Sequence, residues 1–172
     1  MKVIYIRHGE DTRDGYKYDE RLTRYGKKSV KKITIELIEE HGFPDIIHYS
    51  PYYRTRQTKR LMLKVINETL NKELPITNCD FRLSRFFTKS QRRHPDIRRD
   101  TRKRGAPIKE SWKGFKRRVA EHLSEIGDDD NNDYKVIWCV THTLVLDYII
   151  NNHDIEHEYK IPYLDTVVLD IK

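Results

Sequence analysis

Two arginines and two histidines each follow an apolar, β-rich run of this sequence. Arg7 and His8 come directly after the first run, Arg54 follows the second, and His142 follows a late one. Two guanidinium groups aimed at one point suit a group with several anionic oxygens, and a phosphoryl group is the natural occupant. An imidazole among them can attack phosphorus while the arginines neutralise charge on the phosphoryl oxygens. The sequence therefore predicts phosphoryl transfer through a phosphohistidine, with no metal ion required.

Alternating strand and helix patterns would bring these four residues to one edge of a sheet. The patterns predict strands at 2–6, 45–49, 135–141 and 166–171, and helices at 25–41, 52–70, 110–126 and 143–151. Such alternation is typical of an α/β fold, here a three-layer α/β/α sandwich with a mainly parallel central sheet. Ligands bind beyond the carboxyl ends of strands in such sheets, so the four side chains are expected to converge there. A single domain is predicted over residues 1–172.

The pattern at 110–126 is that of an amphipathic helix. Its apolar residues recur at intervals of three or four, at Trp112, Phe115, Val119, Leu123 and Ile126. This spacing places the five side chains on one helix face. We expect that face to pack in the core rather than to stack on nucleic-acid bases.

The composition favours a folded, intracellular protein. Of the 172 residues, 37% are hydrophobic and 10% are aromatic, which argues against a disordered chain. The longest apolar run, 136–140, is far shorter than the ~20 residues of a membrane-spanning helix, and the first residues lack the pattern of a secretory signal. Cys79 and Cys139 form neither a CxxC pair nor a disulfide framework. A cytoplasmic location without a membrane span is therefore expected.

Positive charge gathers in one segment of the chain. The net charge is +7, yet residues 82–118 alone hold 15 basic and three acidic residues. The stretch at about 82–109 lacks apolar periodicity and is predicted to be an exposed loop or insertion. Such a segment can be a solvated surface, or a docking surface for a multiply phosphorylated substrate, nucleic acid or anionic lipid.

The ordered motifs of the chain resemble those of the histidine phosphatase superfamily, also called phosphoglycerate mutase-like. The elements that carry the resemblance are Arg7-His8-Gly9-Glu10, Leu22-Thr23-x-x-Gly26, Ser50-Pro51-x-x-Arg54-x-x-Gln57-Thr58, Glu110-Ser111 followed by Arg118, and Thr141-His142. The resemblance implies that His8 is the phosphorylated nucleophile, that Arg7 and Arg54 clamp the phosphoryl oxygens, and that His142 completes the pocket. Glu10 and Arg85 are further candidates for substrate contact. The implied substrate is an anionic, phosphorylated molecule.

Two positions depart from the family pattern. The family usually supplies a general acid as a Glu two residues after a Leu, and this chain has Arg85 at that position after Leu83. Protonation of the leaving oxygen typically contributes ~10²- to 10⁴-fold to the rate. Either another carboxyl supplies the proton, or the leaving group is good enough to need none, as in a phosphoramidate. The candidate carboxyls are Asp80, Asp100 and Glu110. The second departure is Thr143, where the family commonly has Gly after the second His.

Two alternatives to a phosphatase are open. A phosphoglycerate-type mutase is disfavoured because similar mutases have an Asn six residues after the His, where this chain has Asp14. A mutase also needs an enclosing lid, for which 172 residues leave little room. A weakly active or inactive member could instead keep the phosphate-binding pocket and use residues 82–118 to bind nucleic acid or a phosphoprotein. The sequence leaves the substrate and the oligomeric state open.

Neither a cofactor nor a metal site is predicted. The glycine-rich patterns GxGxxG and GxxxxGK[ST] are both absent. His153 and His157 are spaced to share a helix face, but the stretch is polar and has no obvious third ligand, so zinc binding there is disfavoured. The remaining histidines, His41, His48, His94 and His122, have no partner at a metal-binding spacing.

Overall fold

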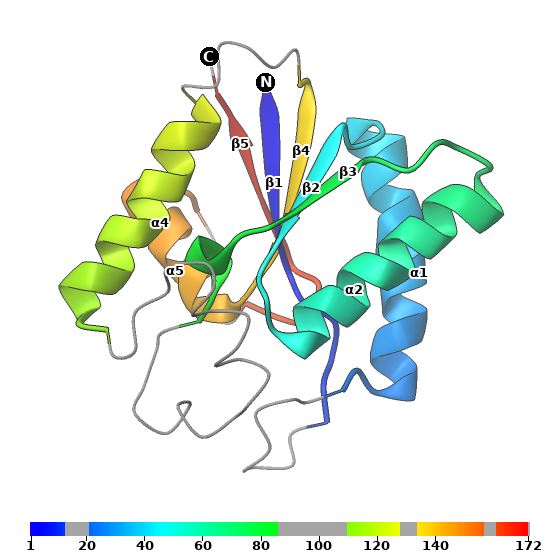
Figure 1. Ribbon diagram of the computed structural model, residues 1–172, viewed down its shortest axis with the longest axis horizontal. Helices are drawn as coiled ribbons and strands as arrows, with labels where there is room; N and C mark the ends of the chain where they lie inside the picture. The colour runs from blue at the N-terminus through cyan, green and yellow to red at the C-terminus, as the bar shows by residue number, and fades with distance from the viewer. Residues whose placement is uncertain (13–20, 86–109, 128–133, 157–160, 172) are drawn as a thin grey trace.

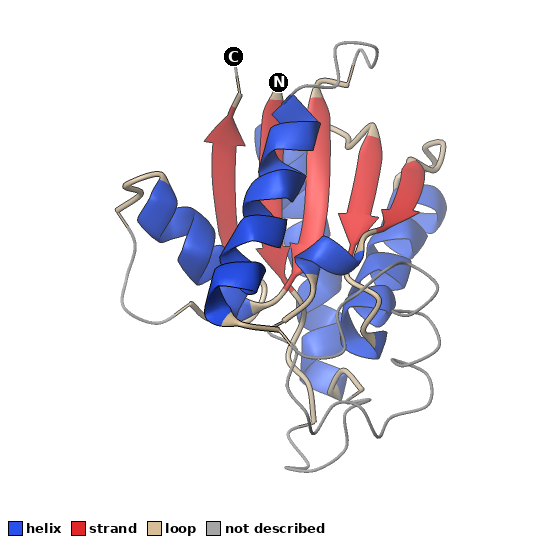
Figure 2. Cartoon of the chain, turned by 60° about the vertical axis from the view of Figure 1, so that its left-hand side comes forward, coloured by secondary structure: helices blue, strands red, loops and turns tan. Residues whose placement is uncertain are grey.

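A five-stranded sheet with the order β3-β2-β4-β1-β5 forms the centre of the computed structural model (Figure 1). The strands are β1 (Lys2–Arg7), β2 (Ile46–Tyr49), β3 (Ile76–Cys79), β4 (Val136–Thr141) and β5 (Thr166–Asp170). All neighbouring strands are parallel except β1 and β5, and β5 runs opposite to the others in Figure 2. The predicted α/β fold with a mainly parallel sheet is confirmed.

Helices cover both faces of the sheet. They are α1 (Arg24–His41), α2 (Tyr53–Lys64), α4 (Trp112–Gly127) and α5 (Thr143–Asn152), with a π-helical turn η1 (Val65–Thr69) and a 3-10 turn η2 (Phe81–Leu83). Figure 1 shows α1 and α2 on one face and α4 and α5 on the other. Along β1, Val3 and Tyr5 pack in the core beneath α4 and α5, whereas Ile4 and Ile6 pack beneath α1 and α2. Both faces of β1 are therefore buried, which explains its uninterrupted apolar run.

The structure describes residues 1–12, 21–85, 110–127, 134–156 and 161–171. Most of the predicted loop at 82–109 lies outside these ranges, as do Asp14, His94, Asp100 and His157. The prediction of a single domain stays a prediction. Among the described helices, none combines the length and the apolar character that a bilayer crossing requires.

The start of α1 is docked on the loop that follows β1. The Thr23 side chain accepts a hydrogen bond of 2.8 Å from the Gly26 N–H, and the Thr23 N–H donates to the carbonyl of Glu10 at 2.9 Å. A Cβ atom on Gly26 would lie 2.3 Å from the carbonyl oxygen of Glu10, so only glycine permits this close approach. The Leu-Thr-x-x-Gly motif thereby fixes the loop that carries His8.

One strand was missed, and two predictions of secondary structure and packing need correction. The edge strand β3 was not predicted, because its residues are mostly exposed and show no apolar alternation. The helix expected over 52–70 is α-helical only to Lys64 and continues as the π-helical turn η1. Trp112 is 49% exposed and stacks on Phe115 at 5.0 Å between ring centroids, so it does not share the buried face of α4. Trp112 is the first residue of α4.

Candidate active site

The carboxyl ends of β1, β2 and β4 bring the predicted residues together. The His8 N–H donates to the carbonyl of Thr141 at 3.1 Å, and the Ser50 N–H donates to the carbonyl of Val140 at 3.1 Å. These bonds place the residues that follow the three strands at one level, at the lower end of the sheet in Figure 1. His8, Ser50, Arg54 and His142 are all buried there.

Two residues of α2 hold the loop after β1 in place. The hydroxyl of Thr58 accepts a hydrogen bond from the Gly9 N–H at 3.0 Å. The side-chain oxygen of Gln57 accepts one from the Leu22 N–H at 2.7 Å. The end of the Ser-Pro-x-x-Arg-x-x-Gln-Thr motif therefore positions the backbone next to His8.

The two ring nitrogens of His8 have different partners. Nε2 lies 2.9 Å from Nε of Arg54, which can only donate, so Nε2 accepts this hydrogen bond with its lone pair. The proton of the neutral ring is then on Nδ1, which donates to the carbonyl of Gly9 at 2.9 Å. The lone pair of the neutral ring is therefore on Nε2, where it is engaged by Arg54.

Burial keeps His8 in its neutral form. Loss of hydration, assisted by the positive charge of Arg54, lowers the pKa of His8 from 6.5 to about 3. The imidazole is therefore uncharged at neutral pH, with one proton on Nδ1 and a lone pair on Nε2. It can act as a nucleophile without first losing a proton.

His142 occupies the other side of the same guanidinium group. Nη2 of Arg54 lies 3.3 Å from Nδ1 of His142, and Nε2 of His142 lies 2.9 Å from the hydroxyl of Ser50. Burial, followed by the charge of Arg54, lowers the pKa of His142 well below its usual value. Because Arg54 donates to Nδ1, Nε2 of His142 carries the proton and donates to Ser50. One guanidinium thus bridges two neutral imidazoles, whose ring centroids are 5.2 Å apart.

Arg7 lies at the end of β1 and is half-buried. Its Nη1 donates to the carbonyl of Ile161, and its guanidinium carbon lies 4.0 Å from the ring centroid of Tyr163. The C-terminal loop therefore orients this side chain. The other two candidates for substrate contact, Glu10 and Arg85, are also half-buried, and the charge of Arg85 is one of the influences that lower the pKa of His142.

The structure adds Asp11 and Tyr163 to this site. The Tyr163 hydroxyl donates to Oδ1 of Asp11 at 2.9 Å, and Oδ2 of Asp11 lies 3.5 Å from Nε of Arg54. Since the Tyr163 ring also stacks on Arg7, the pair connects both arginines of the site. The adjacency of Asp11 to the Arg7-to-Glu10 motif was a signal for its role, but no feature of the sequence pointed to Tyr163.

The described candidates for a general acid have other partners. Oδ2 of Asp80 lies 2.7 Å from Nη2 of Arg82 and 3.1 Å from Nδ1 of His122. Burial alone would raise the pKa of Asp80, but these hydrogen bonds outweigh it and hold the pKa well below the usual value. Asp80 is consequently ionised at neutral pH. Both carboxylate oxygens of Glu110 accept hydrogen bonds from Arg118, at 2.6 Å and 3.0 Å.

Mild acid is expected to destabilise the protein through His8 and His142. Both are neutral when folded, whereas the unfolded chain has histidine pKa values near 6.5, so the unfolded state binds more protons as the pH falls below 6.5. The stability that these rings contribute is thus complete above pH ~6.5 and is lost towards lower pH, by about 1 kcal/mol per pH unit for each histidine. Denaturant unfolding between pH 7 and pH 5 measures the slope. A His8→Gln variant should give a shallower slope, and equal slopes would contradict the assignment.

Several solved structures share this fold. The α-ribazole phosphatase from Shigella flexneri is 23% identical, with a TM-score of 0.63, and the match covers 88% of this chain and 79% of that one. The ecdysone phosphate phosphatase from Bombix mori, in complex with tungstate, is 16% identical, with a TM-score of 0.69 and coverage of 97% and 88%. The protein histidine phosphatase SixA, also with tungstate, is 15% identical, with a TM-score of 0.58 and coverage of 87% and 74%. At these identities the likeness establishes the fold.

The sequence itself identifies the family. None of the curated proteins matches the chain. Residues 3–164, however, match the family described as the histidine phosphatase superfamily (branch 1), and this range includes every residue of the site from Arg7 to Tyr163. The chain belongs to branch 1 of the histidine phosphatase superfamily.

Proposed function

We propose that the protein is a metal-independent phosphatase that hydrolyses a phosphomonoester or a phosphoramidate through a phosphohistidine on His8. The observation that carries the proposal is the state of that ring. It is neutral, its Nδ1 proton is held by the Gly9 carbonyl, and its Nε2 lone pair faces Arg54. A neutral ring with its proton on Nδ1 and its lone pair on Nε2 is what an attack on phosphorus requires.

The first step transfers the phosphoryl group to His8. The substrate's phosphoryl oxygens take hydrogen bonds from Arg54 and Arg7, so Arg54 leaves Nε2 of His8. That lone pair forms a bond to phosphorus, the bond from phosphorus to the leaving oxygen or nitrogen breaks, and the leaving atom keeps the electron pair. The guanidinium groups stabilise the charge on the equatorial oxygens during the transfer.

The second step hydrolyses the phosphoenzyme. Water attacks phosphorus in line with the bond to Nε2, and this bond breaks with its electron pair returning to the ring. A proton from the water passes to solvent or to the phosphate. His142, which is neutral and bonded to Ser50 and Arg54, keeps the Arg54 guanidinium oriented through both steps.

The leaving group is proposed to need no proton from the enzyme. Asp80 is ionised, Glu110 is bonded through both oxygens to Arg118, and Arg85 stands where the family usually has its acidic residue. A phosphoramidate leaves by this route more readily than an alkyl ester does, because its nitrogen takes the required proton from water and then leaves as a neutral amine or imidazole. One of the similar structures is of a protein histidine phosphatase, and phosphohistidine is a phosphoramidate. The basic segment 82–118 favours a substrate with further negative charges.

A second candidate function is that of an inactive phosphate-binding module. The engagement of Asp80 and Glu110 by cationic partners favours it, because no described carboxyl among the three candidates is placed as a proton donor. Such a module would keep the two arginines of the site and could use the basic segment to bind nucleic acid.

A trapping experiment in EDTA tests the phosphatase. The protein is mixed rapidly with p-nitrophenyl phosphate or phosphoramidate and quenched in alkali, in which phosphohistidine is stable, and peptides are analysed by mass spectrometry. We expect phosphate on the peptide that contains His8, turnover of at least one of the two substrates, and no label in a His8→Asn variant. Turnover without label at His8 would refute the mechanism. Phosphate binding with no turnover of either substrate would favour the binding module.

A further inference from the structure

A second group of histidines lies on the α4 side of the sheet. His48 is on β2, Asp80 follows β3, and His122 is on α4. Each residue offers one ligand atom, and these three atoms all lie within 4.8 Å of one another. Asp80 and His122 are buried and His48 is half-buried. Three separate elements therefore aim two imidazoles and one carboxylate at a common point.

Backbone contacts fix the position of each of these residues. His48 is paired with Cys139 in the register of β2 and β4, on the face that α4 covers. The Asp80 N–H donates to the carbonyl of Tyr49 at 2.9 Å. Nε2 of His122 lies 3.7 Å from the sulfur of Cys139, so the His122 ring packs directly against β4 of the sheet. The group is held in place by the sheet and helix rather than by a loose surface loop.

The His122 and Asp80 pair already has the geometry of two ligands of one ion. Nδ1 of His122 donates its proton to Oδ2 of Asp80, and the two atoms are 3.1 Å apart. Metal ligands must be deprotonated, so a cation can take the place of this proton. The ring of His48 is 5.6 Å from that of His122, between centroids, and supplies the third donor.

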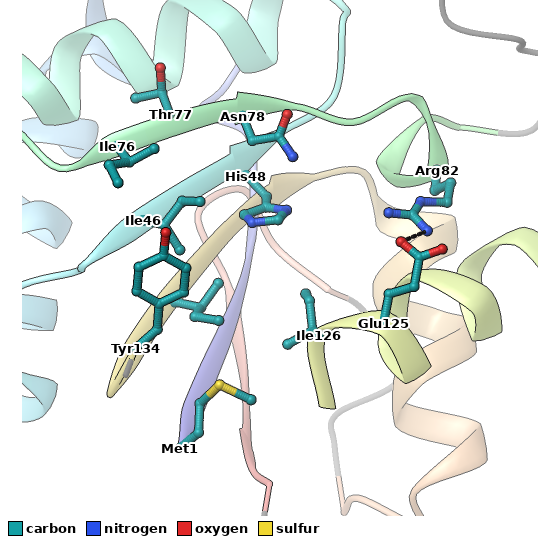
Figure 3. Close-up of a pocket in the computed structure, with 11 residues that line it drawn as sticks. Met1, Ile46, His48, Ile76, Thr77, Asn78, Arg82, Glu125, Ile126 and Tyr134 are labelled. Carbon is teal, nitrogen blue, oxygen red and sulfur yellow. Dashed lines mark ion pairs between the residues drawn. The ribbon is translucent and has the colours of Figure 1, made fainter. Parts of the chain in front are cut away.

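A pocket lies beside this group and is lined by one of its members, His48. Its volume is about 450 Å³, and its lining includes His48, Arg82 and Glu125. Figure 3 shows the His48 ring facing this pocket, opposite the ion pair between Arg82 and Glu125. The other lining residues are Met1, Ile46, Ile76, Thr77, Asn78, Ile126, Tyr134 and Ile137. The pocket gives an ion an entry path and room for a water molecule as a further ligand.

Arg82 has the partners needed to make room for a cation. Its guanidinium contacts Asp80 and also Glu125, which is on the same helix as His122. When a cation occupies Oδ2 of Asp80, Arg82 retains its ion pair with Glu125. The backbone hydrogen bond from the Arg82 N–H to Oδ1 of Asp80, at 2.8 Å, can also persist.

We propose that His48, Asp80 and His122 bind one divalent transition-metal ion, with Zn²⁺ as the preferred physiological ion. Two imidazoles and a carboxylate form a common Zn²⁺ ligand set, whereas Mg²⁺ prefers oxygen ligands only. The ion would join β2, the turn after β3 and α4, so its binding is expected to stabilise the fold. This proposal does not depend on the phosphatase activity, because none of the three ligands belongs to the group around Arg54.

Calorimetric titration of the metal-free protein with Zn²⁺ tests the proposal. The titrations are made in a His8→Ala background, since His8 and His142 also lie together. We expect one Zn²⁺ per chain, no comparable heat with Mg²⁺, and a higher melting temperature in the presence of Zn²⁺. A His48→Ala substitution, at a half-buried position, should weaken Zn²⁺ binding by at least ~10-fold and remove the thermal shift.

His41→Ala is the matched control. His41 is also half-buried but ends α1, where its nearest charged partners are Lys2 and Glu40. The control should bind Zn²⁺ as the background protein does. Equal Zn²⁺ affinities in His48→Ala and His41→Ala would place the ion elsewhere and overturn the proposal, as would no binding at micromolar Zn²⁺.

Discussion

A His8→Asn substitution is expected to lower kcat by at least ~10⁴-fold while changing the affinity for inorganic phosphate only severalfold. The asparagine amide offers no lone pair comparable to that of Nε2, so the covalent step is lost. The groups that would hold a phosphate ion, Arg7, Arg54 and His142, all remain. Steady-state kinetics with p-nitrophenyl phosphate and calorimetric titration with phosphate measure the two quantities separately.

His142→Gln provides a matched comparison for this prediction. His142 is equally buried and contacts the same guanidinium, but its Nε2 proton is bonded to Ser50. The variant should have reduced activity and should still accept a phosphoryl group on His8. If His8→Asn lost phosphate binding in parallel with activity, His8 would be a binding residue and not the nucleophile.

Arg118→Met is expected to lower the free energy of unfolding by ~3–5 kcal/mol. Arg118 is only 4% exposed, and its partner Glu110 is 6% exposed. The substitution leaves the Glu110 carboxylate buried without its cation. It also removes the donors to the carbonyls of Arg82 and Arg85. Denaturant unfolding followed by circular dichroism gives the difference.

Arg117→Met on the same helix is the control for Arg118. The Arg117 side chain is 78% exposed and lies 3.6 Å from Glu121, so its loss should cost less than ~1 kcal/mol. Removal of both buried charges, by Glu110→Gln with Arg118→Met, should restore part of the stability that Arg118→Met loses. A similar cost for Arg117→Met and Arg118→Met would show that burial of the ion pair is not what matters.

The sequence was informative where burial imposes a pattern. The apolar runs of β1 and β4 are buried on both faces, and α1 and α4 repeat their apolar residues at helical spacing. These signals were sufficient for the α/β fold and for the sheet edge at which His8 and His142 lie. The exposed strand β3 has no such pattern, because only its neighbour β2 and the backbone pairing define it.

Contacts between distant segments explain what the sequence could not predict. Asp11 and Tyr163 are joined by a hydrogen bond although the sequence separation is 152 residues. His48 and His122 lack any shared spacing and meet only because α4 packs on the face of the sheet that carries His48. Local periodicity indicates which face of a helix or strand is buried, but it does not indicate which other segment of the chain packs against that face.

The hydrogen bond from Arg54 to Nε2 of His8 has a consequence for selectivity in the resting protein. In the proposed mechanism, the Arg54 guanidinium covers the reactive electron pair of Nε2 until an anion binds that guanidinium instead. A neutral electrophile has no anionic oxygens for the Arg54 guanidinium to bind, so the hydrogen bond to Nε2 remains. An anion with several oxygens binds the Arg54 guanidinium and exposes the Nε2 lone pair in the same event. The substrate's own phosphoryl group would therefore trigger the attack.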